Sequence, residues 1–71
     1  PWMDHKVLKE RINKKLKIKN LSVASVERLA GIGAGALRSF LVGKTKSPTL
    51  ETLSALSQIL DCSLPDLLGL D

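Results

Sequence analysis

The fold of this chain is decided by residues 21–43, LSVASVERLAGIGAGALRSFLVG. Ser22 is a good N-cap for a helix over residues 23–30, because its hydroxyl can accept a free backbone N–H of the first turn. Gly31 can adopt the positive φ that ends such a helix. A second segment with helical periodicity, residues 34–42, begins only three positions later. The stretch therefore predicts two short helices joined by a tight turn that contains glycine.

Three more helical segments flank this pair. Apolar residues recur at helical spacing over residues 4–16, which predicts a first helix. Thr49 or Ser47 can cap a fourth helix that runs to about Leu60, and a short fifth helix is predicted within residues 63–69. No segment alternates as a strand would. The sequence predicts an all-α fold of five helices.

The apolar faces of these helices predict a single core. The chain has 71 residues and one cysteine, Cys62, so it cannot form an internal disulfide. Its stability must come from helix packing, because so short a chain buries only about 60% of its unfolded surface. The predicted core residues are Leu8, Ile12, Val26, Leu29, Leu37, Phe40, Leu53, Leu56, Ile59 and Leu67.

The net charge of +4 is unevenly distributed. Residues 1–46 contain all eleven Lys and Arg and three acidic residues, which gives +8, whereas residues 47–71 contain four acidic residues and give −4. A basic half on a small domain is typical of a protein that binds a polyanion, with counterion release from phosphates supplying affinity. A solvated charged surface without a ligand is the alternative reading of the same charges.

The composition also predicts where the protein acts and how much of the chain is native. No apolar run approaches the roughly 18 residues of a membrane span, and the start lacks the apolar core of a signal peptide. We therefore expect a cytoplasmic protein that contacts no membrane. Pro1 and Trp2 precede Met3, which could be a native initiator, so residues 1–2 are expected to be a non-native remnant and residues 3–71 a single domain.

No motif for catalysis is recognisable. His5, the single histidine, is expected to have a surface role, because no other ligand or base stands at a fitting spacing. Gly31, Gly33 and Gly35 mimic a phosphate-binding loop, but no strand precedes them and no lysine follows at the P-loop spacing. The sequence predicts a protein that is not an enzyme and has no metal site, no cofactor and no small-molecule substrate.

Two short helices at a tight glycine turn are the signature of the helix-turn-helix, whose second helix enters the major groove of DNA. The chain also resembles the lambda-repressor-like (XRE/Cro) class of phage repressors. The resemblance rests on Leu21-Ser22, Val26, Leu29-Ala30-Gly31-Ile32, Leu37, Phe40-Leu41, Gly43-Lys44, Pro48, Leu53, Leu56, Ile59-Leu60 and residues 63–69. Residues 36–48 look especially like prophage repressors that carry a LexA-like C-terminal domain, which is not among the 71 residues here.

This resemblance implies that the third helix reads the bases of double-stranded DNA. Leu37, Phe40 and Leu41 should face the core. Among the residues left for the groove, only Arg38 offers the two-pronged donor that matches guanine, a contact that can discriminate by ~1–3 kcal/mol. The predicted base-reading residues are Ala34, Gly35, Arg38 and Ser39, with Val42 on the same side.

Phosphate contacts are predicted around the same two helices. Free N–H groups at the starts of the second and third helices can hold phosphate oxygens, and the basic loop after the third helix should straddle the DNA backbone. The predicted phosphate-binding residues are Ser22, Val23, Gly33, Lys44, Thr45, Lys46, Ser47, Lys17 and Lys19, with Lys14 as a further candidate.

Two residues depart from the pattern of the class. Val23 stands where many members have a glutamine that bridges base and phosphate, so that clamp is missing. Glu27 stands where a small residue usually lets the two helices approach each other. Burying an uncompensated carboxylate is costly, so we expect Glu27 to reach solvent or to pair with a nearby base such as Arg38.

The sequence thus predicts a sequence-specific transcriptional regulator, a phage-type repressor of bacterial or phage origin that can form a homodimer on paired half-sites. Two alternatives stay open. One is a helix-turn-helix used as a protein-interaction module, in which the small side chains of residues 34–36 meet a protein partner. The other is a DNA-binding antitoxin paired with a separately encoded toxin.

Overall fold

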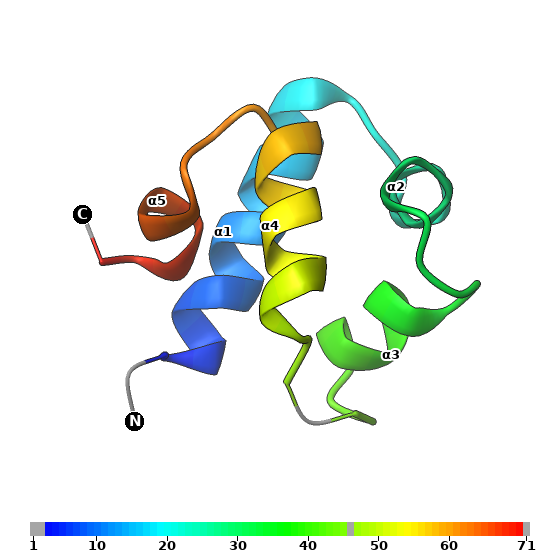
Figure 1. Ribbon diagram of the computed structural model, residues 1–71, viewed down its shortest axis with the longest axis horizontal. Helices are drawn as coiled ribbons and strands as arrows, with labels where there is room; N and C mark the ends of the chain where they lie inside the picture. The colour runs from blue at the N-terminus through cyan, green and yellow to red at the C-terminus, as the bar shows by residue number, and fades with distance from the viewer. Residues whose placement is uncertain (1–2, 46, 71) are drawn as a thin grey trace.

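The computed structural model describes residues 3–45 and 47–70, which form five α-helices and, within those ranges, no strand. In Figure 1, α2 and α3 lie on one side of α4 and α5 lies on the other. α2 packs against α3 and α4, and α5 packs against α1 and α4. The predicted all-α fold is confirmed. The helices are α1 (His5–Lys19), α2 (Val23–Ala30), α3 (Ala36–Leu41), α4 (Leu50–Ile59) and α5 (Leu64–Leu68).

Side-chain caps start four of the five helices. The Asp4 carboxylate accepts the N–H groups of Lys6 and Val7 at the start of α1. Ser22, Thr49 and Ser63 each accept, at 3.1 Å, the N–H of the residue three positions later. Each cap satisfies a backbone donor that has no partner within its helix. Thr49, rather than Ser47, is the residue that caps α4.

Two helix boundaries differ from the predicted ones. α1 continues through Lys19 and ends at Asn20, which adopts the left-handed conformation at φ 55° that asparagine tolerates. α3 begins at Ala36, two residues later than predicted, because Gly35 has φ 84° and cannot be part of a right-handed helix. The N–H of Ala36 bonds instead to the carbonyl of Gly33 at 3.0 Å, which closes a turn. Helical periodicity alone did not detect this turn.

The core contains most of the predicted residues. Leu29 is an error of the sequence prediction, because its side chain is 64% exposed. α2 buries the side that carries Val26 and Glu27, and a residue two positions after Glu27 points about 200° away from it. Ile59 is half-buried at the edge of the core. The sequence prediction missed four buried apolar residues, Met3, Leu16, Leu60 and Leu68.

Ion pairs join α1 to the acidic C-terminal part of the chain. Asp66 on α5 accepts from Arg11 at 2.8 Å and from Lys15 at 2.7 Å, and Lys19 lies 3.3 Å from Asp61. The hydrogen bond from Lys15 holds the pKa of Asp66 below its ordinary value, and the same bond raises the pKa of Lys15. Part of the positive charge of α1 is therefore balanced within the molecule.

Replacing Phe40 with alanine should be strongly destabilising. Phe40 is 2% exposed and belongs to the core, so Phe40→Ala should lower the free energy of unfolding by about 3–5 kcal/mol, a large share of the stability of a small domain. Leu29→Ala is the matched control and should cost under about 1 kcal/mol, because Leu29 is exposed. Urea denaturation followed by circular dichroism measures both. Equal losses in the two variants would contradict this placement of α2 and α3.

Candidate nucleic-acid interface

The turn between α2 and α3 spans residues 31–35 and orients the two helices relative to each other. Gly31 ends α2 in the left-handed conformation, at φ 71°, and its N–H bonds to the carbonyl of Arg28 at 3.2 Å. The N–H of Ile32 bonds to the carbonyl of Glu27 at 3.1 Å. A residue with a Cβ rarely adopts the backbone conformation of Gly31, which explains a glycine at this position.

Glu27 is the residue that joins α2 to α3. Its side chain is 5% exposed, and its carboxylate accepts three backbone N–H groups at the start of α3. Oε1 accepts from Gly35 at 2.9 Å, and Oε2 accepts from Leu37 at 2.8 Å and from Arg38 at 3.1 Å. Since Gly35 has no side chain that could cap the helix, the carboxylate of Glu27 takes over the role of the N-cap.

The expectation for Glu27 was therefore wrong. The carboxylate neither reaches solvent nor forms an ion pair with the guanidinium of Arg38; it accepts the backbone N–H of Arg38 instead. The hydrogen bond from Gly35, followed by that from Arg38, keeps the pKa of Glu27 below its ordinary value of 4.5. Burial of the charge is tolerable because three donors and the helix dipole replace the lost water.

The N-termini of α2 and α3 consequently differ in the number of backbone N–H groups that are free to bind a phosphate. At the start of α3, the N–H groups of Gly35, Leu37 and Arg38 are already bonded to Glu27, so they are not available for the phosphate contact that the sequence predicts at the start of this helix. Gly33, in the middle of the turn, keeps an N–H with no hydrogen bond in the described part of the chain. At the start of α2, the only backbone N–H that the hydroxyl of Ser22 accepts within the described residues is that of Ser25, which leaves the amides of residues 23 and 24 for a ligand.

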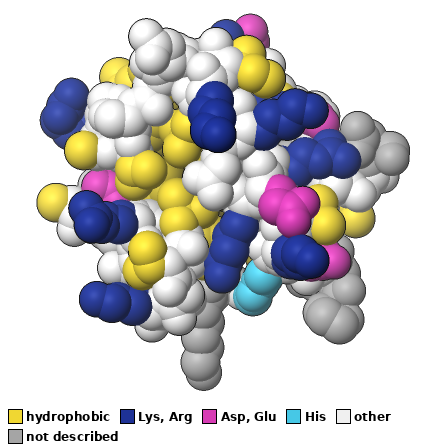
Figure 2. Space-filling view, turned by 180° about the vertical axis from the view of Figure 1, so that it is seen from behind, with side chains coloured by type: hydrophobic (Ala, Val, Ile, Leu, Met, Phe, Trp, Pro, Cys, Tyr) yellow, Lys and Arg dark blue, Asp and Glu magenta, His cyan; other side chains and the backbone are white. Residues whose placement is uncertain are grey.

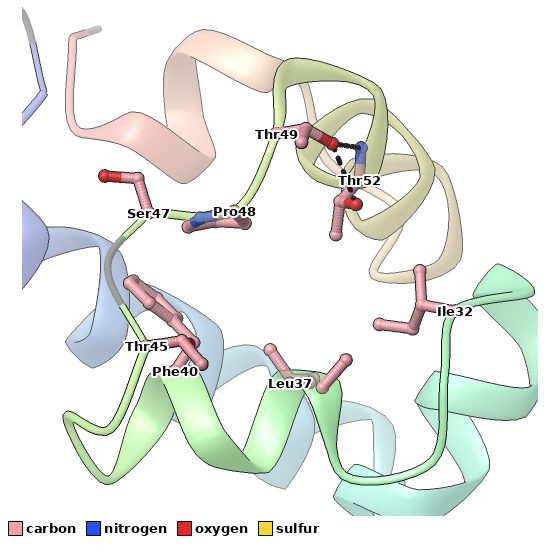
Figure 3. A pocket seen from close by; sticks show the side chains of 9 residues that line it. Ile32, Leu37, Phe40, Thr45, Ser47, Pro48, Thr49 and Thr52 are labelled. Carbon is pink, nitrogen blue, oxygen red and sulfur yellow. Dashed lines mark hydrogen bonds between the residues drawn. The ribbon is translucent and has the colours of Figure 1, made fainter.

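A pocket of about 230 Å³ separates α3 from the start of α4. Ile32, Leu37 and Phe40 line one side of it, and Pro48, Thr49 and Thr52 line the other (Figure 3). α3 packs mainly against α2 and does not rest closely on α4. The orientation of α3 therefore depends on the contact with α2, of which Glu27 is the polar part.

The predicted base-reading residues lie together on one segment, residues 34–39. Arg38 is exposed on α3 and has no ion pair among residues 3–45 and 47–70. Ala34 is exposed in the turn, and Gly35 is half-buried immediately before the helix. Ser39 is half-buried, and its carbonyl accepts the N–H of Lys44 at 2.8 Å. Arg38 is thus the long donor side chain that α3 presents to a ligand.

The predicted phosphate-binding side chains are distributed over two regions. Lys44, Thr45 and Ser47 are exposed in the loop after α3, whereas Lys46 lies outside the described residues, as do Pro1 and Trp2. Lys17 is exposed near the end of α1, and Lys19 is engaged with Asp61. Figure 2 shows Lys and Arg side chains spread over one face of the molecule, with apolar side chains between them.

The sequence analysis did not connect His5 with this loop. His5 is exposed, but its Nε2 atom lies 2.7 Å from the hydroxyl oxygen of Ser47, the residue that precedes Pro48. The two residues are 42 positions apart, and no local pattern indicates a contact over such a separation. The tertiary structure brings them together, with the ring of His5 also standing edge-on to that of Phe40 on α3.

The described architecture is that of a helix-turn-helix DNA-binding domain, in which α2 and α3 form the motif. The chain belongs to the family of the Cro/C1-type HTH DNA-binding domain, whose model matches residues 11–71. Comparisons with curated proteins and with solved structures find no match. Among the described residues, no helix combines the length and the apolar character that crossing a membrane requires.

Replacing Glu27 with glutamine should loosen α3. Glu27→Gln keeps the size of the side chain but exchanges one acceptor oxygen for an NH₂ donor, which faces backbone N–H groups. A carboxylate whose pKa is lowered in the folded state stabilises the fold fully at pH values above its ordinary pKa of 4.5. This stabilisation is lost as the pH falls through the lowered pKa. The melting temperature of the variant should therefore lie several degrees below that of the wild type at about pH 7, with a smaller difference at about pH 2.

Glu10→Gln is the matched control for this measurement. Glu10 is an exposed carboxylate on α1, so its replacement should leave the melting temperature nearly unchanged across the same pH series. An equal effect of the two substitutions, or a wild-type advantage over Glu27→Gln that persists undiminished at about pH 2, would contradict the capping role of Glu27.

Proposed function

We propose that this domain is the DNA-reading part of a phage-type transcriptional repressor, which inserts α3 into the major groove of double-stranded DNA. The observation that carries the proposal is the presentation of Arg38. Its side chain is exposed on a helix that Glu27 holds against α2, within a family of DNA-binding domains. A guanidinium held in this way can bond to two acceptors of guanine at once.

In this proposal, few residues contact the bases and more residues contact the phosphates. Ala34 can pack on a thymine methyl group and Ser39 can add one hydrogen bond. Gly35 contributes no free backbone group, because its N–H bonds to Glu27 and its carbonyl accepts the N–H of Ser39. The free amides of residues 23 and 24, the Gly33 amide and the loop residues Lys44 to Ser47 hold the DNA backbone on both sides of α3. Arg38 therefore sets the preference among sites, and the remaining contacts set the affinity.

Lys17 and Lys19 are proposed as outer phosphate contacts, and they differ in strength. Lys19 already interacts with Asp61 at 3.3 Å, so a phosphate has to compete with that carboxylate. Lys17 is exposed and carries no ion pair within residues 3–45 and 47–70. A homodimer on paired half-sites fits a repressor of this kind, and Leu70, which is 58% exposed after α5, is available for such a contact.

A protein-interaction module is the second candidate function, because α2 and α3 also expose apolar side chains. Leu29 is 64% exposed and Val42 is 60% exposed, and Ala34 and Ala36 are exposed on the same two-helix unit. A protein partner would bury such side chains. DNA binding requires only that they do not clash with the walls of the groove. Binding of the domain to random duplex DNA with a steep salt dependence favours the DNA-binding function, and absence of such binding favours the module.

Variants of Arg38 and Lys44 should separate base reading from phosphate binding. Arg38→Ala should flatten the preference among DNA sites and reduce the affinity for random duplex only modestly, because a base contact carries sequence information. Lys44→Ala should weaken the binding of all sequences alike and lower the salt slope by about one. The same is expected of Lys46→Ala. Fluorescence anisotropy on a selected site and on random duplex, over a salt series, measures both quantities.

Lys19→Ala is the charge-matched control for Lys44→Ala. It removes the same charge, but from a lysine that already interacts with Asp61, so the salt slope should change by clearly less than one. Full retention of site preference in Arg38→Ala would contradict the assignment of Arg38 as the base-reading residue.

A further inference from the structure

The N-terminal turns of α1 border the loop that follows α3. The Nε2 atom of His5 lies 2.7 Å from the hydroxyl oxygen of Ser47. The imidazole also stands edge-on to the ring of Phe40, with 5.8 Å between the ring centroids and an interplanar angle of 84°. One turn further along α1, the ammonium group of Lys9 lies 5.3 Å from the centroid of the same ring. Phe40 therefore holds two basic side chains of α1 beside the loop.

This cluster reaches the surface. His5 and Ser47 are exposed, and Lys9 is half-buried against Phe40. The loop itself carries Lys44, which is exposed. An anion that approaches Ser47 thus meets a hydroxyl group and several positive or protonatable groups.

The hydrogen bond between His5 and Ser47 can run in either direction. A neutral imidazole can accept the hydroxyl proton of Ser47 at Nε2, and that proton is then not available to a ligand. A protonated imidazole has donors on both nitrogens, so Nε2–H donates and the oxygen of Ser47 accepts. The hydroxyl proton of Ser47 is then free to donate outward. Protonation of His5 therefore turns Ser47 into a donor and adds a positive charge beside it.

His5 forms no ion pair with a carboxylate of residues 3–45 and 47–70. The carboxylate of Asp4 accepts the N–H groups that begin α1. The other charged residues on the elements near His5 are Asp4, Lys6 and Lys9 on and before α1, Arg38 on α3, Lys44 in the loop and Glu51 in the first turn of α4.

We infer that His5, Ser47 and Lys9 form a subsite for one backbone phosphate of DNA, and that filling this subsite takes up a proton at His5. The inference rests on the DNA-binding function proposed above. The phosphate accepts the hydroxyl proton of Ser47 and supplies the negative charge that protonated His5 and Lys9 lack. Because the phosphate favours the protonated form of the imidazole, the affinity for DNA increases as the pH falls.

The experiment measures the affinity for a random DNA duplex at about pH 5.5 and pH 7.5, at a constant salt concentration, by fluorescence anisotropy. We expect the wild type to bind about 3- to 10-fold more tightly at the lower pH, the gain typical of one added charge-assisted hydrogen bond. His5→Gln retains a hydrogen-bonding side chain without a charge and should lose this difference. Ser47→Ala should lose most of it, because the phosphate then lacks its donor.

Ser54→Ala is the matched control for Ser47→Ala. Ser54 is an exposed serine on α4 whose hydroxyl makes no hydrogen bond in the described structure, and its replacement should leave the pH dependence unchanged. Thermal unfolding at both pH values verifies that each variant is folded. NMR detection of the His5 ring distinguishes the source of the phosphate, because duplex DNA should shift its signals and an equal concentration of inorganic phosphate should not.

The possible outcomes distinguish failure of the DNA-binding function from failure of the phosphate subsite. If the wild type binds no DNA at either pH, the proposed function itself is wrong. If the wild type binds DNA but its pH dependence is absent, or survives in His5→Gln, the subsite is refuted while the DNA-binding function stands. A full pH dependence in Ser47→Ala would refute the role of Ser47, and an equal response of the His5 ring to inorganic phosphate would refute a site specific for the DNA backbone.

Discussion

The hydrogen bonds from the start of α3 to the Glu27 carboxylate are the interaction on which the rest of the two-helix unit depends. α3 has six residues, too few to be stable as an isolated helix, and a pocket separates it from α4. One side chain of α2 accepts three of its backbone N–H groups. This arrangement fixes the start of α3 and its angle to α2. The direction in which Arg38 leaves the helix follows from that angle.

The same interaction changes the electrostatics of the surface. The N-terminus of a helix ordinarily attracts a phosphate, but here a carboxylate of the protein already occupies that position on α3. The N-terminus of α2 keeps its free amides. Ion pairs between α1 and the residues Asp61 and Asp66 neutralise positive charge on the other side of the fold. The described cations without such a partner include Arg38 and Lys44, which flank the end of α3.

The sequence allowed the helices, most of the core and the family to be predicted, because each depends on local patterns. Ser22 and Gly31 marked the ends of α2 at the residues where the structure has them. Leu29 was misplaced because an eight-residue helix with several apolar positions does not reveal which side faces its neighbours. Glu27 was misread for a related reason. The cost of burying a carboxylate depends on donors that lie eight to eleven residues away, across the turn.

The sequence by itself determined the presence of five helices, the hydroxyl caps of α2, α4 and α5 and the glycine that ends α2, since short-range sterics and capping hydrogen bonds control these features. It also determined the excess of positive charge in the first half of the chain. Only the tertiary structure decided which cations remain exposed, which helix terminus stays open, and that His5 meets Ser47. These features depend on contacts between residues far apart in the chain, whose distances are set by the packing of whole helices.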